Sequence, residues 1–272
     1  MAGGSTLTPF NNVLITGASR GIGEALALAC AAPGVTLHLS GRDRPRLDAV
    51  ADRARARGAA VHGRVLDVRS RDAMADWIGG AGRLDLVVAN AGVAAGTAGG
   101  IEPDAQSREI FDTNLDGALN TARPAIGAML AQEPGPDGVR GRIAVIASMA
   151  VYMATPGGPA YAASKTALDV WTQATGINTR RRGVVLTSFC PGYVRTAMTA
   201  DNTYHMPGLM SPEQAAAIIL RNVPRGRPRV TFPLWMALGA QVVNVLPADR
   251  IDRLLRALPG RTAQGYIMGP GR

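Results

Sequence analysis

A short apolar run near the N-terminus leads directly into a glycine-rich turn and then into a helix-like segment. The run covers residues 12–16, the turn reads Gly17-Ala-Ser-Arg-Gly-Ile-Gly23, and an alanine- and leucine-rich segment continues to residue 30. This order favours a buried strand whose turn lets the backbone approach a pyrophosphate, with N–H donors at the helix start. The spacing is GxxxGxG, and a turn that only packs a helix on a strand is the alternative. We predict that a dinucleotide contacts Gly17, Ser19, Arg20, Gly21, Ile22 and Gly23.

The rest of the chain alternates between apolar runs of strand length and segments of helical periodicity. The runs lie at residues 35–39, 59–65, 84–89, 143–147, 184–189 and 229–232. This alternation predicts an α/β fold with a doubly wound parallel sheet. Because no linker is long enough to divide the chain, we expect one nucleotide-binding domain over residues 1–272. An apolar, then arginine-rich extension starts at about residue 233 and would form a subunit interface, a pocket wall or a membrane-surface helix.

The end of the second strand indicates which dinucleotide binds. Such folds place an acidic residue there for a ribose 2′-hydroxyl, or an arginine for a 2′-phosphate. Here Gly41 takes the acidic position, Arg42 follows it, and Arg20 adds a second cation, although Asp43 is nearby. We therefore predict NADP(H) over NAD(H), with arginines that are merely solvated as the alternative. Further contacts are predicted at later strand ends, where the residues are Asp67, Val68, Asn90, Ala91, Gly92, Pro191, Gly192, Val194 and Thr196.

A tyrosine and a lysine one helical turn apart suggest acid–base chemistry. Tyr161 and Lys165 share one helix face, where an ammonium would lower the pKa of the phenol. Ser148 ends an apolar strand and would stand beside them as a second hydroxyl. Lys165 is the only lysine among 29 basic residues, although a core tyrosine beside a surface lysine would be the ordinary alternative. Asn114 lies inside a long helix at 104–131, which predicts a backbone distortion or a bound water there.

Composition narrows the partners and the compartment. The net charge is +9, but the arginines are spread along the chain and only 4% of residues are aromatic, so we expect no nucleic-acid partner. The two cysteines lie in apolar contexts typical of a reducing compartment, and three scattered histidines predict no metal site. We see no signal peptide and no membrane-spanning segment. We thus expect a cytoplasmic protein, with peripheral membrane contact through the apolar C-terminal segment as an option. Residues 198–210, rich in methionine, would form a lid over an apolar substrate.

The ordered set of motifs resembles the short-chain dehydrogenase/reductase family, in its single-domain branch. The matching residues are Thr16 to Gly23, Asn90 to Gly92, Asn114, Ser148, Tyr161, Lys165 and Pro191-Gly192. The resemblance implies a Rossmann-type seven-stranded parallel sheet in a three-layer αβα arrangement, and a homodimer or homotetramer. It also implies that Tyr161 is the catalytic acid/base, that Ser148 polarises the substrate oxygen, and that Asn114 holds a water in the proton relay. Lys165 would bind the nicotinamide ribose and lower the tyrosine pKa.

Together these features predict an NADP(H)-dependent oxidoreductase that interconverts a ketone or aldehyde and an alcohol on a small hydrophobic substrate. A scaffold or sensor that binds the dinucleotide without chemistry is the rival hypothesis. The complete Ser148, Tyr161 and Lys165 set argues against it.

Overall fold

One continuous parallel sheet organises the molecule, as the sequence predicts. The computed structural model describes residues 10–97, 100–200, 206–244 and 250. Its seven strands are β1 (Asn12–Ile15), β2 (Thr36–Gly41), β3 (Ala60–Val65), β4 (Leu86–Ala89), β5 (Gly141–Ile146), β6 (Val184–Pro191) and β7 (Arg229–Phe232). They lie in the order β3-β2-β1-β4-β5-β6-β7. Every neighbouring pair is parallel. The strand order reverses between β1 and β4, which is where such sheets bind ligands.

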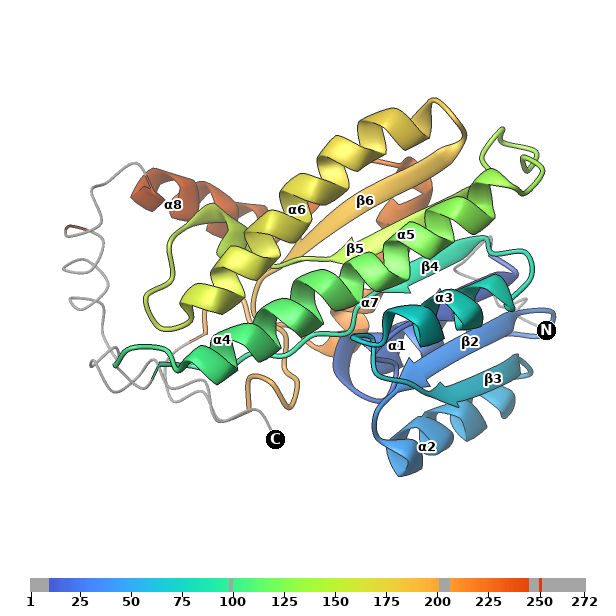
Figure 1. Cartoon of the computed structure of the whole chain (residues 1–272), viewed down its shortest axis with the longest axis horizontal. Coiled ribbons are helices and arrows are strands. Elements are labelled where there is room, and N and C mark those ends of the chain that lie inside the picture. Colours follow the sequence, from blue (N-terminus) through green and yellow to red (C-terminus); the bar gives the residue numbers. More distant parts are fainter. Residues whose placement is uncertain (1–9, 98–99, 201–205, 245–249, 251–272) are drawn as a thin grey trace, which may run out of the picture.

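Helices cover both faces of the sheet, so the molecule has three layers (Figure 1). One face carries α1 (Gly21–Cys30), α2 (Arg44–Arg55) and α7 (Pro212–Asn222). The other carries α3 (Arg71–Gly79), α5 (Gly117–Leu130) and α6 (Pro159–Arg180). The remaining helical segments include α4 (Asp104–Phe111), two 3₁₀ turns at Met149–Tyr152 and Val223–Arg225, and α8 (Leu234–Asn244). This is the expected doubly wound, Rossmann-type α/β fold.

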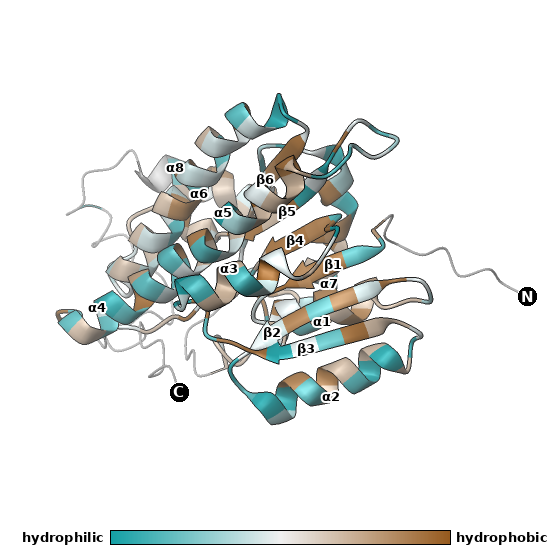
Figure 2. Cartoon of the chain, turned by 45° about the vertical axis from the view of Figure 1, so that its right-hand side comes forward, coloured by the Kyte–Doolittle hydropathy of each residue, from teal (hydrophilic) through white to brown (hydrophobic). Residues whose placement is uncertain are grey.

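Burial explains why the apolar runs became central strands. All residues of β4 and β6 are buried, as continuous apolar runs require in a sheet covered on both faces. The edge strand β3 is mostly exposed and contains His62 and Arg64. Figure 2 shows hydrophobic residues concentrated on β1 and β4 at the centre, with hydrophilic residues on the outer faces of the helices. The apolar core therefore lies on both sides of the central strands.

Asn114 marks a break in the long helix predicted at 104–131. Residues Asp112–Asp116 form one turn of π-helix between α4 and α5. The Asn114 side chain accepts a hydrogen bond from the Val93 N–H at 2.7 Å and donates to the Val93 carbonyl at 2.9 Å. Single π-helical turns inserted into an α-helix occur frequently at functional sites. The predicted backbone distortion is confirmed.

The helix starts follow the capping signals of the sequence. The Asp43 carboxylate accepts the Arg46 N–H at the start of α2. Ser211 and Gln214 form a reciprocal capping box at the start of α7, with Pro212 at its first position. These local bonds satisfy N–H groups that a helix leaves unpaired.

The apolar C-terminal extension is described only in part. Its first residues form α8, and Leu234, Trp235 and Leu238 on that helix are 64%, 58% and 57% exposed. Among the described helices, none is both long and apolar enough to cross a bilayer. Residues 245–249 and 251–272 of the extension, and residues 201–205 of the expected lid, lie outside the described residues.

Candidate active site

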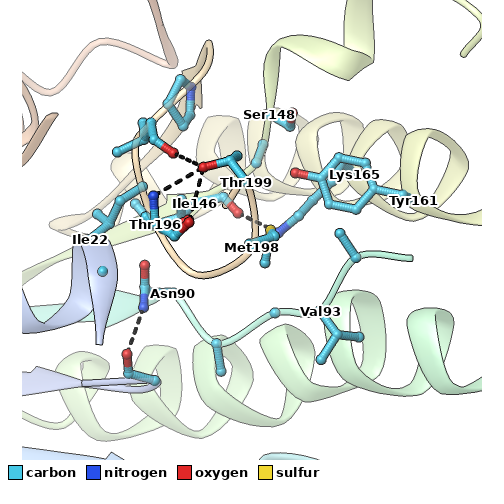
Figure 3. A pocket seen from close by; sticks show the side chains of 18 of the residues that line it. Ile22, Asn90, Val93, Ile146, Ser148, Tyr161, Lys165, Thr196, Met198 and Thr199 are labelled. Atoms are coloured by element: carbon cyan, nitrogen blue, oxygen red, sulfur yellow. Dashed lines mark hydrogen bonds between the residues drawn. The ribbon is translucent and has the colours of Figure 1, made fainter. Parts of the chain in front are cut away.

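A cavity of about 1070 Å³ opens along the carboxyl ends of the strands, at the point where the strand order reverses. Its walls come from the glycine turn, the ends of β2 and β4, the segment after β5, α6, the segment after β6, and α8. Figure 3 shows part of this wall, with Asn90 and Ile22 at one side and Ser148, Tyr161 and Lys165 at the other. The cavity brings together segments from both halves of the chain.

Most of the predicted site residues line this one cavity. They are Gly17, Ser19, Arg20, Gly21, Ile22, Arg42, Asp67, Val68, Asn90, Ala91, Gly92, Ser148, Tyr161, Lys165, Pro191, Gly192, Val194 and Thr196. Gly23 and Asn114, which were also predicted, lie one layer behind its surface.

The glycine turn has the conformation that a close-approach loop needs. Gly17 and Gly21 adopt positive φ angles of 65° and 60°, which favour glycine. A Cβ at Gly17 would lie 2.9 Å from the Ala91 Cα. The Asn90 amide reaches across from the end of β4 and donates to the Gly17 carbonyl at 3.1 Å. The Asn90 side chain thus fixes the turn from the end of β4. Most residues of the turn still line the cavity.

Gly23 and Asn114 shape the site without lining it. A Cβ at Gly23 would lie 2.2 Å from the Gly17 carbonyl oxygen, so this glycine permits α1 to pack against the turn. Asn114 is fully buried, and its Oδ1 lies beside Gly92, where a Cβ would be 3.1 Å away. That same Cβ would be 3.4 Å from the Lys165 ammonium. Gly23 thus has a packing role beneath the turn, and its contact with a dinucleotide remains a prediction.

The end of β2 provides a cationic, small-residue corner. A Cβ at Gly41 would lie 3.0 Å from the Ser19 Oγ, so an acidic side chain would crowd this position. Arg20, Arg42 and Arg46 are exposed and line the cavity here. The Asp43 carboxylate faces Arg46, with its oxygen 3.3 Å from the Arg46 Nε, and caps α2. The Asp43 carboxylate is thereby already paired within the first turn of α2.

Asp67 is one of the predicted dinucleotide contacts, and its carboxylate has a partner within the chain. It lines the cavity, but its carboxylate accepts hydrogen bonds from Arg69, including one from Nε at 2.9 Å. The hydrogen bond from Arg69 holds the pKa of the Asp67 carboxyl below its usual value. Its acceptor capacity is partly used by this neighbour, which the sequence pattern did not reveal.

Tyr161 and Lys165 face the cavity together with Ser148, from α6 and the end of β5. In Figure 3 the Tyr161 hydroxyl points toward Ser148, and the Lys165 side chain runs beside the phenol ring toward Ile146. The Lys165 ammonium donates to the Ile146 carbonyl at 2.8 Å. The Ser148 Oγ accepts the Ala150 N–H at 3.1 Å, which leaves its own O–H as a donor. A phenol, a hydroxyl and a buried amine therefore converge at one point.

Burial shifts the pKa values of this group. It raises the pKa of Tyr161, an effect that the hydrogen bond with Ser148 only partly opposes. The sequence predicted a lowered value, and that direction is wrong for this structure because loss of phenolate solvation dominates. Burial also lowers the pKa of Lys165 to about 8, since an ammonium is costly to desolvate. Both groups thus tend toward their neutral forms.

The segment after β6 closes the opposite wall. The Gly192 N–H donates to the Phe232 carbonyl at 2.8 Å and fixes the turn after β6. Thr196 packs against the glycine turn, since a Cβ at Gly21 would lie 3.0 Å from the Thr196 Cγ2. The Thr196 N–H is bonded to the Thr199 hydroxyl at 3.0 Å. The glycine turn and the segment after β6, both predicted to contact the dinucleotide, therefore lie next to each other.

Several cavity residues had no signal in the sequence. Ser40 and Thr113 line the cavity, are 1% and 5% exposed, and have hydroxyls without a partner among the described residues. Such orphaned hydroxyls, together with the glycine cradle and the arginine corner, fit a polar dinucleotide. The apolar end is lined by Met149, Met153, Met198, Trp235 and Met236. Of the three roles open to the extension, α8 has that of a pocket wall. Only the folded chain reveals Ser40, Thr113, Met149 and Met153, because their residue types are common in strands and helices. Met198 lies in the predicted lid, and Trp235 and Met236 lie in the extension.

Comparisons with known proteins agree with this geometry. Residues 11–206 match the family model described as short chain dehydrogenase. The chain is 36% identical over 253 residues to an uncharacterized oxidoreductase of Myxococcus xanthus, covering 92% of this chain and 98% of that protein. It is 30% identical over 265 residues to the ketoacyl reductase HetN of a Nostoc species, covering 93% of this chain and 90% of that protein.

A solved structure has the same fold. The crystal structure of a short-chain type dehydrogenase/reductase from Mycobacterium marinum superposes with a TM-score of 0.71. The sequences are 26% identical, and the match covers 83% of this chain and 94% of that one.

Proposed function

The chain belongs to the short-chain dehydrogenase/reductase family, and we propose that it is an NADP(H)-dependent oxidoreductase interconverting a ketone or aldehyde and an alcohol. The observation that carries this proposal is the convergence of Ser148, Tyr161 and Lys165 in the cavity that also holds the glycine turn. A protein that only bound a dinucleotide would have no use for an acid–base group at that place. The oxidoreductase function is therefore favoured over a scaffold.

The proposed chemistry assigns one task to each side chain. A bound nicotinamide supplies or accepts the hydride at the substrate carbon. The Ser148 hydroxyl donates a hydrogen bond to the substrate oxygen, where negative charge develops during reduction. Tyr161 gives its phenolic proton to that oxygen and takes it back in the oxidation direction. The pKa of Tyr161 is raised by burial, so the phenol holds its proton at neutral pH.

Lys165 and Asn114 support this proton transfer from behind. Lys165 uses one N–H for the Ile146 carbonyl and has two more for a ribose hydroxyl of the cofactor. When protonated, its ammonium stabilises the phenolate that Tyr161 becomes after donating. Asn114 lies beside Gly92 and Lys165, where it would hold a water that returns the proton from solvent.

NADP(H) is the proposed cofactor because of the corner at the end of β2. Arg42 and Arg20 supply the cations that a 2′-phosphate needs, and Arg46 adds a third. Gly41 leaves no carboxylate where a 2′-hydroxyl would be bound. The buried Ser40 hydroxyl adds a donor beside the same corner.

The substrate is proposed to be small and hydrophobic. Methionines and Trp235 line the end of the cavity beyond Ser148 and Tyr161, and flexible thioethers adapt to apolar ligands of varied shape. A relative named as a ketoacyl reductase supports a carbonyl group as the reacting function.

The surface and the thiols of the protein support proposals for its compartment, its oligomeric state and its contact with membranes. We propose a single-domain protein of the cytoplasm, where the buried free thiols Cys30 and Cys190 stay reduced. We propose a homodimer or homotetramer, supported by the exposed Val170 and Ile177 on α6. The exposed apolar face of α8 supports peripheral contact with a membrane surface.

Replacing the phenol hydroxyl tests the proposed function. Oxidation of NADPH is followed with a panel of aliphatic and aromatic ketones for the native protein and for Tyr161→Phe. We expect the variant to lose turnover by at least about a hundredfold, because general acid catalysis contributes on that scale. Binding of NADPH, measured by its fluorescence, should be retained. Undiminished turnover by Tyr161→Phe would refute the role of this residue.

A further inference from the structure

A buried carboxylate that the proposed mechanism does not use lies on the same helix face as the acid–base pair. Asp169 follows Lys165 by one turn and Tyr161 by two turns of α6. Asp169 is only 1% exposed. Burying a carboxylate is expensive unless hydrogen bonds satisfy its lone pairs and a cation balances its charge.

Three elements provide those partners. The Asp169 Oδ1 accepts hydrogen bonds from the Ser188 hydroxyl of β6 at 2.6 Å and from the Arg229 Nε of β7 at 3.1 Å. Its Oδ2 accepts from a second nitrogen of Arg229 and from the Gln173 amide, the latter at 3.0 Å. The Cys190 thiol lies 3.7 Å from Oδ1. The carboxylate therefore ties α6 to β6 and β7 in a forked ion pair.

Arg229 also reaches the segment that carries Ser148. Its guanidinium carbon lies 5.3 Å from the centre of the Tyr152 ring, within the range of a cation–π contact. The Tyr152 hydroxyl is hydrogen-bonded to the Thr231 hydroxyl at 2.6 Å. Tyr152 ends the 3₁₀ turn that Ser148 caps. Arg229 thus bridges the helix of Tyr161 and the segment of Ser148.

We propose that Asp169 and Arg229 are positioning residues, which hold the Ser148 segment against α6 so that the Ser148 and Tyr161 hydroxyls face the same substrate oxygen. This inference rests on the proposed function. Proton transfer and oxyanion stabilisation depend steeply on distance, and a misplacement of about 1 Å can cost roughly a hundredfold in rate. An ion pair that served stability alone would leave the turnover number of the folded enzyme unchanged.

Arg229→Met removes the bridge and tests the inference. With NADPH and the ketone that reacts fastest in the panel, we expect kcat to fall roughly tenfold to a hundredfold. The KM for NADPH should change by less than about threefold, since the ion pair lies away from the glycine turn. Asp169→Asn should act in the same direction. Arg229→Lys keeps a cation without the fork and should restore part of kcat.

A matched control separates positioning from general stability. Arg142 of β5 pairs with Asp137 at 2.7 Å, at the amino end of the sheet. Arg142→Met removes an ion pair of another strand, whose carboxylate partner is more exposed than Asp169, and should leave kcat of the folded protein at the native value. Circular dichroism and thermal unfolding confirm that each variant is folded at the assay temperature.

The outcomes distinguish this inference from the proposed function. If folded Arg229→Met turns over as fast as the native enzyme while Tyr161→Phe is inactive, the positioning role is refuted and the proposed function stands. If Tyr161→Phe is as active as the native enzyme, the proposed function itself fails. Should Arg229→Met not fold, Tyr152→Leu replaces it, because that change leaves the ion pair intact and removes the contacts of the Ser148 segment with Arg229 and Thr231. A native kcat in Tyr152→Leu would then overturn the inference.

Discussion

Lys165 is the only lysine in the chain, and it is only 5% exposed. Arginine keeps its charge in almost any surroundings, whereas an ammonium loses its proton readily when buried. The structure uses that property, since burial lowers the pKa of Lys165 to about 8. A lysine at this position, unlike an arginine, can therefore change its protonation state when it is buried.

Lys165 should leave a signature in the pH dependence of stability. The unfolded lysine keeps its proton up to about pH 10.5, while the folded one releases it above about pH 8. In that window the unfolded state binds more protons, so stability rises with pH. We expect the free energy of unfolding of the native protein, relative to Lys165→Met, to be flat below pH 8 and to rise between pH 8 and 10.5.

Denaturant titrations of both proteins without cofactor at several pH values measure this difference. Subtracting the variant cancels the buried thiols Cys30 and Cys190, whose pKa values burial raises to about 12. A difference that stays constant across the window would contradict the assigned pKa.

Arg42 should decide between the two dinucleotides. Arg42→Ala is expected to weaken NADPH binding by roughly tenfold to a hundredfold, as the loss of one charge-assisted hydrogen bond implies. NADH, which has no 2′-phosphate, should bind almost as before. Fluorescence titration with both cofactors measures the two dissociation constants. Arg44→Ala is the control, because Arg44 is exposed on α2 and lies outside the cavity wall. Equal losses for both cofactors in Arg42→Ala would discard the NADP(H) assignment.

At the scale of single elements, α6 combines the most functions. One face presents Tyr161, Lys165 and Asp169 in successive turns to the sheet and the cavity. The π-helical turn at Asp112–Asp116 similarly turns Asn114 inward toward Val93. In both cases helical spacing places the residues, and the neighbouring strands give them their partners.

The helix α8 has one side toward the cavity and an apolar side toward solvent. Leu234 and Leu238 are one turn apart and exposed, and neither lines the cavity. If this face contacts a membrane surface, Leu234→Ser combined with Leu238→Ser should reduce co-sedimentation with anionic phospholipid vesicles. Turnover of a water-soluble ketone should be unchanged. Ile101→Ser, at a residue 97% exposed on a loop, should bind vesicles like the native protein. Undiminished vesicle binding by the double variant would rule out this contact.

The proposed assembly involves the whole molecule and the exposed apolar side chains of α6. Val170 and Ile177 lie on the same side of α6 and are 57% and 62% exposed. We expect light scattering to give two or four times the chain mass of 28.2 kDa. Val170→Glu with Ile177→Glu should shift the mass toward one chain, because a buried unpaired charge is costly at an interface. Ile101→Glu serves as the control. A native protein that scatters as a single chain would contradict the proposed assembly.

The sequence predicted the sheet, its strands and most of the cavity because these depend on local patterns. Short apolar runs such as 84–89, bounded by turn residues, are typical of buried strands, and glycines at 17 and 21 favour positive φ angles. The ordered motifs also placed Ser148, Tyr161 and Lys165 at one site. Local spacing was enough, since parallel strands all end at the same edge of the sheet.

Tertiary structure alone decided what depends on contacts between distant segments. Burial reversed the expected direction of the Tyr161 pKa, and Arg69 engaged the carboxylate of Asp67. The pairing of Asp169 with Arg229 joins residues 60 positions apart, and no sequence period connects them. Solvation and electrostatic energies depend on what surrounds a group in space, so the chain order determines which groups are present and only packing determines their charge and their partners.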